Sequence, residues 1–557
     1  MNLLTSVATS VTRLFDRVGL HLVAAIVALF VSGSTGSAAD GWLRVMIKDD
    51  RGKTIPARAW VDVGKSRLFE PVGPATCTPY NRDRSFSCDG WFVMRIPAGE
   101  ATLHVERGKE WLPLDKVVSI DQGRTNSIAV TLKRWVNLAD EGWYSADMHV
   151  HFGHDNPRVM SQLALADDVN IVPAFSLWLR GREKQWQKDW PPWGTDETIA
   201  VDNTHFLTRA NLEIERIGRS AGPGGEVGAT FIYQLGKPVS ADRFDTRFPT
   251  DTTLALAAKQ ASTTCVIDTD KPSWAETVIG AALGVYDTAQ VCHNHYHRDR
   301  TMPGGWGMIG ELNATEKDLN VPDELFRRTN AQYYRWLNCG IRMGVSGGSA
   351  MGVMAVPLGY NRVYAKVEGE LTPVKFWAAV KAGRTFATSG PMLTMTVNGH
   401  EAGSVIESSK AGSIQVRAQI RSIDQLSAVE IIQNGTVVFR DDLSRRVPRP
   451  PFAYQASLEI AVTRSGWFAA RVLYRAPDGR LRQAHTSPVY VIANGKPIAS
   501  KADAQYNIRW VDRLLAISDM PDRYRSGEDR LQVQKVYRQA RAVYENVSRM
   551  AVEVWGD

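Results

Sequence analysis

The sequence predicts a multidomain fold in which a central α/β domain is flanked by an N-terminal and a C-terminal β-sandwich and followed by a helical tail. Three observations predict this fold. Short alternating apolar runs separated by turn signals fill 40–135 and return over 391–495. Strand-like and helical runs alternate over 136–390, and helical spacing with charged faces fills 496–557. A chain of 557 residues, 44% of them hydrophobic, is long enough to build about three such cores.

The first 39 residues have the pattern of an export signal. Arg13 and Arg17 precede an apolar run over 20–31, and small residues at 37–39 precede Asp40. The apolar run is too short to cross a bilayer, which needs about 20 apolar residues, so we expect no transmembrane segment in the mature chain. A retained N-terminal anchor is the alternative. We therefore expect a signal peptide over 1–39 and a periplasmic or secreted protein.

The N-terminal sandwich is predicted over 40–135. Its alternating runs are separated by turn signals such as Asp50-Arg51-Gly52. The phrase DDRGKTIPARAWVDV resembles the carboxypeptidase-regulatory-like accessory domains of secreted proteins. Cys77 and Cys88 flank a polar segment within this domain, and a disulfide between them would constrain the unfolded chain. We expect that disulfide.

The α/β domain is predicted over 136–390. Strand-like runs at 169–175, 229–233 and 265–268 alternate with helical patterns at 203–217 and 273–283. Such alternation predicts a parallel sheet or a barrel, in which chemistry gathers at the carboxyl ends of the strands. The remaining cysteines, Cys265, Cys292 and Cys339, are expected to be buried thiols.

Two histidine motifs in this block indicate a metal site. His149 and His151 stand two residues apart after a strand-like run, so on a strand both point to one face, with Asp147 one step along it. Neutral imidazole binds zinc, iron and manganese, and a nearby carboxylate can ligate or fix the imidazole tautomer. An ordinary surface pair of histidines is the alternative interpretation.

The second motif strengthens the first. Of the chain's 11 histidines, His293, His295 and His297 occupy alternating positions in the run CHNHYHRD. Histidine pairs at the ends of different strands are what a site assembled across one sheet or barrel requires. A solvated histidine-rich loop is the alternative.

The C-terminal sandwich is predicted over 391–495. Asn398-Gly399, Asn434-Gly435 and Asp478-Gly479 are hairpin signals between alternating runs. The tail over 496–557 has apolar residues at helical spacing, and we expect its helices to pack back on the body.

Charge argues against a nucleic-acid partner. The formal net charge of +7 is spread over 66 basic and 59 acidic side chains, without a long basic run. We expect no nucleic-acid binding and a small-molecule or polymer-derived substrate, with anionic substrates mildly favoured. The sequence leaves the oligomeric state open.

Five phrases follow one another in an order that resembles a known family. They are GWYSADMHVHFGHD, NTHFLTRANLEIERI, IDTDKPSWAE, VCHNHYHRD and GYNRVYAKV…VKAGRTFATSGPMLTMTVNG. Together they look like a divergent member of the CehA/McbA-type metallohydrolases of the PHP (polymerase and histidinol phosphatase) superfamily. The resemblance covers roughly 140–400. It implies a distorted (β/α)7 PHP-like barrel with one to three divalent ions at its carboxyl rim, hydrolysing phosphoester, carbamate or amide bonds.

The resemblance also implies a ligand set. His149 and His151 match the family's first motif, with Asp147 in the neighbouring acidic place. His293, His295 and His297 would supply further nitrogen ligands, and a carboxylate would come from the helix expected over 203–217. Glu213 and Glu215 point about 200° apart on a helix, so only one can face the site, and we favour Glu213.

The chain departs from the family at two places. The late Asp-x-His motif is replaced by VSGGSAMG over 345–352, which has neither acid nor imidazole. The His-Pro expected after a central strand is replaced by DTDKP over 268–272. His154 and Asp155 are candidates to replace the missing ligands.

The expected function is an exported divalent-metal-dependent hydrolase, with zinc or manganese as the cofactor. Such an ion lowers the pKa of a water toward neutrality and polarises the bond to be cleaved. Lys271 and Arg298, with Arg342, would stabilise developing negative charge. No GxSxG elbow or P-loop stands in a strand-turn-helix context. The alternative is a catalytically degenerate PHP-like protein that is exported and serves in binding or interaction.

Overall fold

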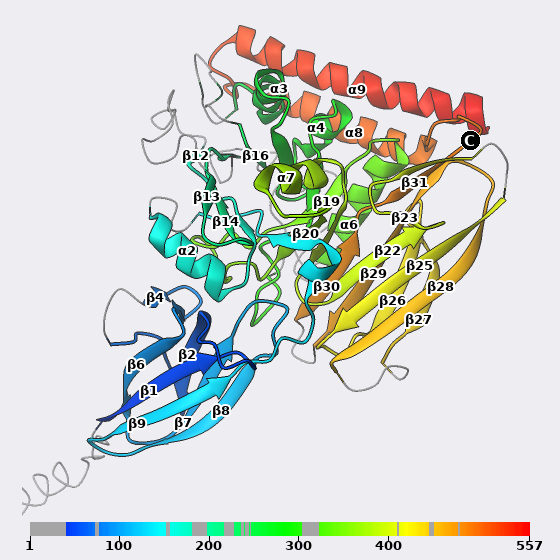
Figure 1. Ribbon diagram of the computed structural model, residues 1–557. Coiled ribbons are helices and arrows are strands. Elements are labelled where there is room, and N and C mark those ends of the chain that lie inside the picture. The colour runs from blue at the N-terminus through cyan, green and yellow to red at the C-terminus, as the bar shows by residue number, and fades with distance from the viewer. Residues whose placement is uncertain are drawn as a thin grey trace, which may run out of the picture.

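The computed structural model describes most of the chain (Figure 1). It describes residues 40–72, 77–151, 156–180, 198–216, 228–235, 239, 244, 247–302, 322–408, 412–444, 450–476 and 480–556. The N-terminal sandwich and the C-terminal helices lie at opposite ends, blue and red in the figure, with the α/β domain between them. The predicted signal peptide lies outside the described residues.

The N-terminal domain is a sandwich of two sheets. One sheet has the order β6-β1-β9, and the other has the order β4-β5-β2-β7-β8 with β3 paired to β2. The strands are β1(Asp40–Lys48), β2(Ala57–Val63), β3(Ser66–Leu68), β4(Cys77–Tyr80), β5(Ser85–Cys88), β6(Trp91–Pro97), β7(Gly99–Glu106), β8(Leu114–Ile120) and β9(Thr125–Thr131). Alternation puts Leu43, Val45 and Ile47 of β1 inside, where all three are fully buried. This alternation is what makes the two sheets pack face to face.

Cys77 and Cys88 lie directly opposite each other on the antiparallel strands β4 and β5. Both are thiols in this structure, so the predicted disulfide is not formed in it. The Cys77 sulfur instead lies 4.0 Å from the carbonyl oxygen of Trp91. Burial raises the pKa of the Cys88 thiol to about 12.

The α/β domain is built on a ring of strand segments. In chain order the segments are β10(Trp143–Ala146); β11(Ile171–Val172) leading into β12(Leu177–Arg180); β14(Phe206–Thr208) leading into β15(Leu212–Arg216); β16(Gly228–Tyr233); β17(Val266–Thr269); β18(Thr288–Cys292); and β19(Gly344–Gly347). Strands β12, β15, β16, β17, β18 and β19 form one sheet, in which β16 runs antiparallel to both neighbours and β17, β18 and β19 run parallel.

Main-chain hydrogen bonds join the segment after β10 to β19 on one side and to the segment before β12 on the other. The Met148 amide donates to the Gly347 carbonyl over 3.0 Å, and the Phe175 amide donates to the Val150 carbonyl over 3.0 Å. Val150 also bridges in parallel to Ala174 and to Met351. The segment after β10 therefore lies between the segment before β12 and the loop after β19, and it carries His149 and His151.

Side-chain caps set the starts of several helices. The helices of the domain are α2(Pro157–Ala166), α3(Asp251–Ala261), α4(Thr277–Ala282), α6(Pro322–Asn338) and α7(Pro373–Lys381), and a short 3-10 turn η1(Leu138–Glu141) precedes β10. Asn156, Thr250 and Thr372 each accept a hydrogen bond from the backbone amide three residues on. These caps satisfy amides that have no partner within the helix.

The prediction of a helix over 203–217 is wrong. This segment forms β14 and β15, separated by a turn in which Ala210 has φ +61. Asp202 accepts hydrogen bonds from the amides of Thr204 and His205, which fixes a turn where the helix was expected to begin. The helix expected over 273–283 is shorter than predicted, since α4 begins only at Thr277.

The C-terminal domain is also a sandwich, but one of its sheets continues into the α/β domain. A 12-stranded sheet follows the order β13-β14-β11-β10-β20-β21-β30-β29-β26-β27, with β24 and β31 beside it, and a 4-stranded sheet of order β23-β22-β25-β28 covers its C-terminal part. The remaining strands are β13(Thr198–Ala200), β20(Arg362–Lys366), β21(Thr385–Thr388), β22(Met392–Val397), β23(His400–Glu401), β24(Val405–Ser408), β25(Gly412–Ser422), β26(Ala428–Gln433), β27(Thr436–Asp442), β28(Phe452–Val462), β29(Gly466–Arg475), β30(Leu481–Thr486) and β31(Val489–Ala493). Strand β21 pairs with β20 on one side and with β30 on the other.

The chain ends in a helical hairpin of α8(Lys501–Ser518) and α9(Gly527–Trp555). Trp510 on α8 donates to the Ala275 carbonyl over 3.0 Å, and Tyr544 on α9 donates to the Val278 carbonyl over 2.8 Å. The predicted β-sandwich-rich multidomain architecture with a helical tail is confirmed. Within the residues that the structure describes, no helix is both long and apolar enough to cross a membrane.

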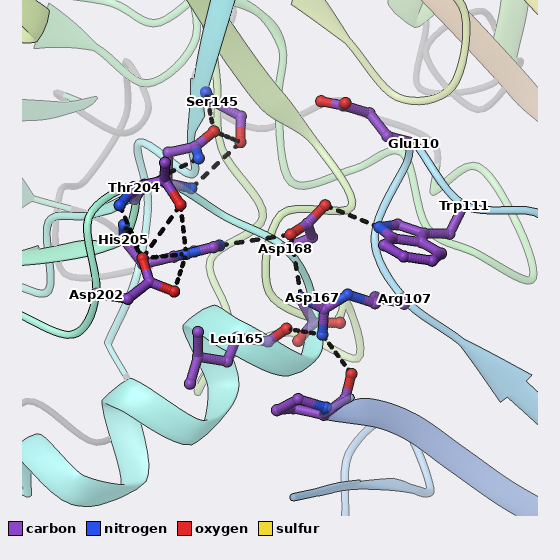
Figure 2. A network of polar contacts seen from close by, with 12 residues as sticks. Arg107, Glu110, Trp111, Ser145, Leu165, Asp167, Asp168, Asp202, Thr204 and His205 are labelled. Atoms are coloured by element: carbon purple, nitrogen blue, oxygen red, sulfur yellow. Dashed lines mark hydrogen bonds and ion pairs between the residues drawn. The ribbon is translucent and has the colours of Figure 1, made fainter. Parts of the chain in front are cut away.

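A buried polar network joins the N-terminal sandwich to the α/β domain (Figure 2). Asp168 accepts hydrogen bonds from Trp111 Nε1 over 2.9 Å and from Arg134 over 2.7 Å, and it pairs with Arg107. His205 lies between Asp168 and Asp202, at 3.5 and 2.9 Å. Burial alone would lower the pKa of His205, but the two carboxylates outweigh it and raise that pKa. The network is therefore a charged contact between domains.

Candidate metal centre

Three predicted ligands converge at one point of the ring. His149 Nε2 lies 2.9 Å from His151 Nε2 and 3.8 Å from Glu213 Oε1, and His151 Nε2 lies 3.1 Å from Glu213 Oε2. His149 is 4% exposed and Glu213 is 1% exposed. Within the described part of the chain, these residues form the one group of three or more His, Cys, Asp or Glu side chains whose ligand atoms could share an ion.

Strand geometry explains this convergence. His149 and His151 alternate along the extended segment after β10, so both imidazoles point to the same side. Glu213 comes from β15, and the same alternation turns Glu215 to the same side of that strand. The helical argument that set the two glutamates on opposite sides is therefore wrong, although Glu213 is the one that meets the histidines. Glu215 instead accepts a hydrogen bond from Trp178 Nε1 over 2.8 Å.

The residues present fit a divalent ion. Ligand atoms on one tetrahedral ion are about 3.4 Å apart, because each bond is about 2.0–2.2 Å long, and the observed separations bracket that value. Two imidazoles and one carboxylate leave a coordination position open, as catalytic sites require. Imidazole suits zinc and carboxylate suits manganese, so the donor set is compatible with either metal.

Asp147 supports the backbone around the group and does not join it. Its carboxylate accepts hydrogen bonds from the amides of His149, Ser349 and Gly359, over 3.1, 2.8 and 2.7 Å. It thereby ties the segment of the two histidines to the loops before and after 350. The sequence had suggested that it would ligate or orient an imidazole.

Asp270 lies beside Nδ1, the other ring nitrogen of His149. Its Oδ1 lies 3.7 Å from His149 Nδ1, and its Oδ2 accepts a hydrogen bond from Lys271. Burial would raise the pKa of Asp270, but Lys271 and His149 lower it below its usual range. Lys271 also stacks on Trp274, with its Nζ 4.6 Å from the ring centroid. Lys271 is thus held beside Asp270 by an ion pair and by the Trp274 ring.

Asp268, the other carboxylate of this loop, is completely buried in a shell of donors. Ser346 Oγ, Thr288 Oγ1 and Gln290 Nε2 donate to it over 2.7, 2.9 and 3.0 Å. Burial raises the pKa of Asp268 to about 7. It connects the ends of β17, β18 and β19 beneath the centre.

The second histidine motif is buried but does not enter the ligand group. His293, His295 and His297 are at most 2% exposed. His293 Nε2 lies 3.3 Å from Thr329 Oγ1. Burial lowers the pKa of His293 to about 3 and that of His297 to about 4, and it lowers that of His295 well below its usual range. Burial thus favours the neutral form of these imidazoles, which is the form that binds metals.

Arg298 faces away from this chemistry and toward the N-terminal sandwich. Its guanidinium donates to Glu106 over 2.7 Å and to Asp83, and it stacks over Trp60 at 4.4 Å. These contacts place Arg298 at the interface between the N-terminal sandwich and the α/β domain. Arg342 stacks on Tyr490 of the C-terminal sandwich at 5.6 Å.

Aromatic rings enclose the two imidazoles, and sequence reasoning missed them. Phe231 lies 4.5 Å from the His149 ring, Trp178 lies 4.2 Å from the His151 ring, and Phe175 contacts both. Phe175 and Phe231 lie in the strand-like runs at 169–175 and 229–233, and the alternation of side chains along a strand was the signal that could have predicted which of them face the site. His154 and Asp155, proposed as substitute ligands, lie outside the described residues.

Comparison with known proteins adds little to this geometry. No family model matches the chain, and no curated protein matches it. Among solved structures, the fibronectin(III)-like modules of Clostridium thermocellum CbhA are 24% identical in sequence, covering 18% of this chain and 96% of that chain with a TM-score of 0.13. A TM-score this low assigns no fold.

Proposed function

We propose that this chain is an exported divalent-metal-dependent hydrolase with a PHP-like barrel of the CehA/McbA type. It would cleave a phosphoester, carbamate or amide bond of a small-molecule or polymer-derived substrate. The observation that carries the proposal is the meeting of His149, His151 and Glu213, from two separate strands, with ligand atoms within 4.8 Å of one another.

The strand arrangement supports the barrel. The segment after β10 makes main-chain hydrogen bonds on both sides, to the loop after β19 and to the segment before β12. A ring of this kind brings carboxyl ends of several strands to one rim, where hydrolytic sites of α/β barrels lie. His149 follows the carboxyl end of β10, as a position at such a rim requires.

The residues would act in distinct ways. His149, His151 and Glu213 would hold the ion, and Asp270, braced by Lys271, would keep the His149 imidazole turned with Nε2 toward it. The ion, when bound, would supply a water of lowered pKa and polarise the bond under attack. The aromatic rings around the imidazoles keep bulk water from the ligands, which strengthens their interaction with a cation.

The test is a metal and activity assay on the mature protein. His149→Ala combined with His151→Ala should remove most bound zinc or manganese, measured by plasma mass spectrometry, and abolish hydrolysis of aryl phosphate, carbamate and anilide probes. His400→Ala, an exposed histidine on β23, is the matched control and should change neither. Unchanged metal stoichiometry in the double variant would refute the site.

One observation favours a second candidate, an exported PHP-like binding protein without turnover. The segment 345–352 supplies neither carboxylate nor imidazole to the centre, and the ligand group contains three residues. If the protein only binds, the purified chain should contain stoichiometric metal and should hydrolyse none of the probes. Hydrolysis that depends on added metal and on His149 would exclude it.

A further inference from the structure

A cavity of about 100 Å³ lies where the three domains meet, apart from the ligand group. Its wall includes Lys109 and Trp111 from the N-terminal domain, Tyr360 and Arg362 from the α/β domain, and Asp424 and Arg482 from the C-terminal domain. A space of this size holds several water molecules or one small oxyanion.

Four cations and three carboxylates line the cavity, and two of the carboxylates, Glu106 and Asp167, are paired with Arg298 and Arg58. Arg482 donates to both carboxylate oxygens of Asp424 at 2.8 Å. Arg362 donates to main-chain carbonyls and to the Ser145 hydroxyl. Among the described residues, no carboxylate lies within ion-pair distance of Lys109, whose Nζ donates to the Ser389 carbonyl over 2.8 Å and stands 3.8 Å from the Tyr360 ring centroid.

Donors remain for a ligand at this place. The Lys109 ammonium has three N–H groups, and one is used by the Ser389 carbonyl. Tyr360 is 6% exposed, and its hydroxyl lies beside the Arg482 guanidinium, from which it can only accept, so its own proton is still available for donation. Burial first, and then the charges of Arg482 and Arg362, lower the pKa of Lys109 well below its usual range. An anion would supply the missing counter-charge.

We propose that this cavity binds a small oxyanion, a phosphate or carboxylate group, on Lys109 Nζ and the Tyr360 hydroxyl. Hydrogen bonds from an ammonium to an oxyanion are short and strong. The site is independent of the proposed hydrolase. It is nevertheless linked to the metal centre, because the Gly359 amide beside Tyr360 donates to Asp147 over 2.7 Å. A bound anion would therefore fasten three domains at a loop that supports His149.

The experiment is calorimetric titration of the mature chain with inorganic phosphate and, separately, with acetate at constant ionic strength. The protein carries His149→Ala and His151→Ala, so that neither anion binds through a metal at the other centre. We expect saturable binding at one site, weakened about tenfold or more by Lys109→Met and by Tyr360→Phe. Lys116→Met, an exposed lysine on β8 of the same domain, should bind as the parent does.

The two anions distinguish the source of the oxyanion. Tighter binding of phosphate indicates a phosphate group, and tighter binding of acetate indicates a carboxylate group. Absence of saturable binding by either, or undiminished binding in Lys109→Met, would overturn the proposal. If Lys109→Met does not fold, judged by its circular dichroism, Tyr360→Phe decides, because it keeps every charge and removes only the hydroxyl.

Discussion

A side chain at position 348 would collide with His149: a Cβ built on Gly348 lies 2.5 Å from the His149 Cβ and 2.9 Å from Gln290 Oε1. Real Cβ atoms essentially never come this close to other atoms. The glycine is therefore part of how His149 is held. Position 348 lies within the segment 345–352, which has neither acid nor imidazole.

Gly348→Ala should consequently weaken metal binding. The added methyl group must displace His149 or the strand segment beneath it, and we expect about a tenfold or greater loss of zinc affinity, measured by competition with a chromogenic chelator. Gly412→Ala is the matched control, since its added methyl would meet open space without a left-handed backbone. Equal affinity in the two variants would show that His149 is not a ligand.

Glu213→Gln should lose metal while Glu215→Gln should not. Both residues lie on β15, but Glu213 is beside His151 and Glu215 accepts a hydrogen bond from Trp178, which glutamine can also accept. Removing the carboxylate charge removes a ligand, and we expect a loss of about tenfold or more in metal affinity for Glu213→Gln. Metal titration of the two purified variants measures the difference, and similar losses would contradict the assignment.

Asp147→Asn should destabilise the protein although the side chains have the same shape. The two carboxylate oxygens of Asp147 accept from the main-chain amides of Ser349 and Gly359. In asparagine one of these oxygens becomes an NH₂ group, which cannot accept a hydrogen bond. At least one buried main-chain amide would therefore lose its acceptor. We expect a loss of about 1–3 kcal/mol in the free energy of unfolding by urea. Asp424→Asn, whose partner Arg482 can still donate to the amide oxygen, should cost less, and an equal cost would argue against the three-amide role.

The His205 network should make stability depend on pH. The pKa of His205 is raised in the folded protein by Asp168 and Asp202. Its stabilising contribution is therefore complete below about pH 6.5, the unfolded value, and is lost as pH rises through the higher folded pKa. His205→Gln should lower the melting temperature more at pH 6 than at pH 9, by differential scanning fluorimetry. A difference that is the same at both pH values would contradict a charged His205.

Local pattern in the sequence was enough to predict the sandwiches, the helical tail and the His149–His151 pair, because each follows from alternation or helical spacing. It failed over 203–217, where the local pattern suggested a helix. Turn bonds from Asp202 and pairing with β12 made the segment extended, and pairing is not visible in a local pattern. Arg298 was misplaced for a similar reason, since its carboxylate partners lie far away in the sequence, in another domain.

The continuous sheet through β20, β21 and β30 limits where the chain can be divided into fragments for expression. A cut near 390 would seem to release the C-terminal sandwich as a module, because β22 begins there. Such a cut would strip β30 of its partner β21 and leave a long sheet edge with unpaired amides and carbonyls on both fragments. Exposed edges of this kind recruit other chains. We expect fragments divided at 390 to aggregate, so the α/β domain and the C-terminal sandwich must be expressed together as one folding unit.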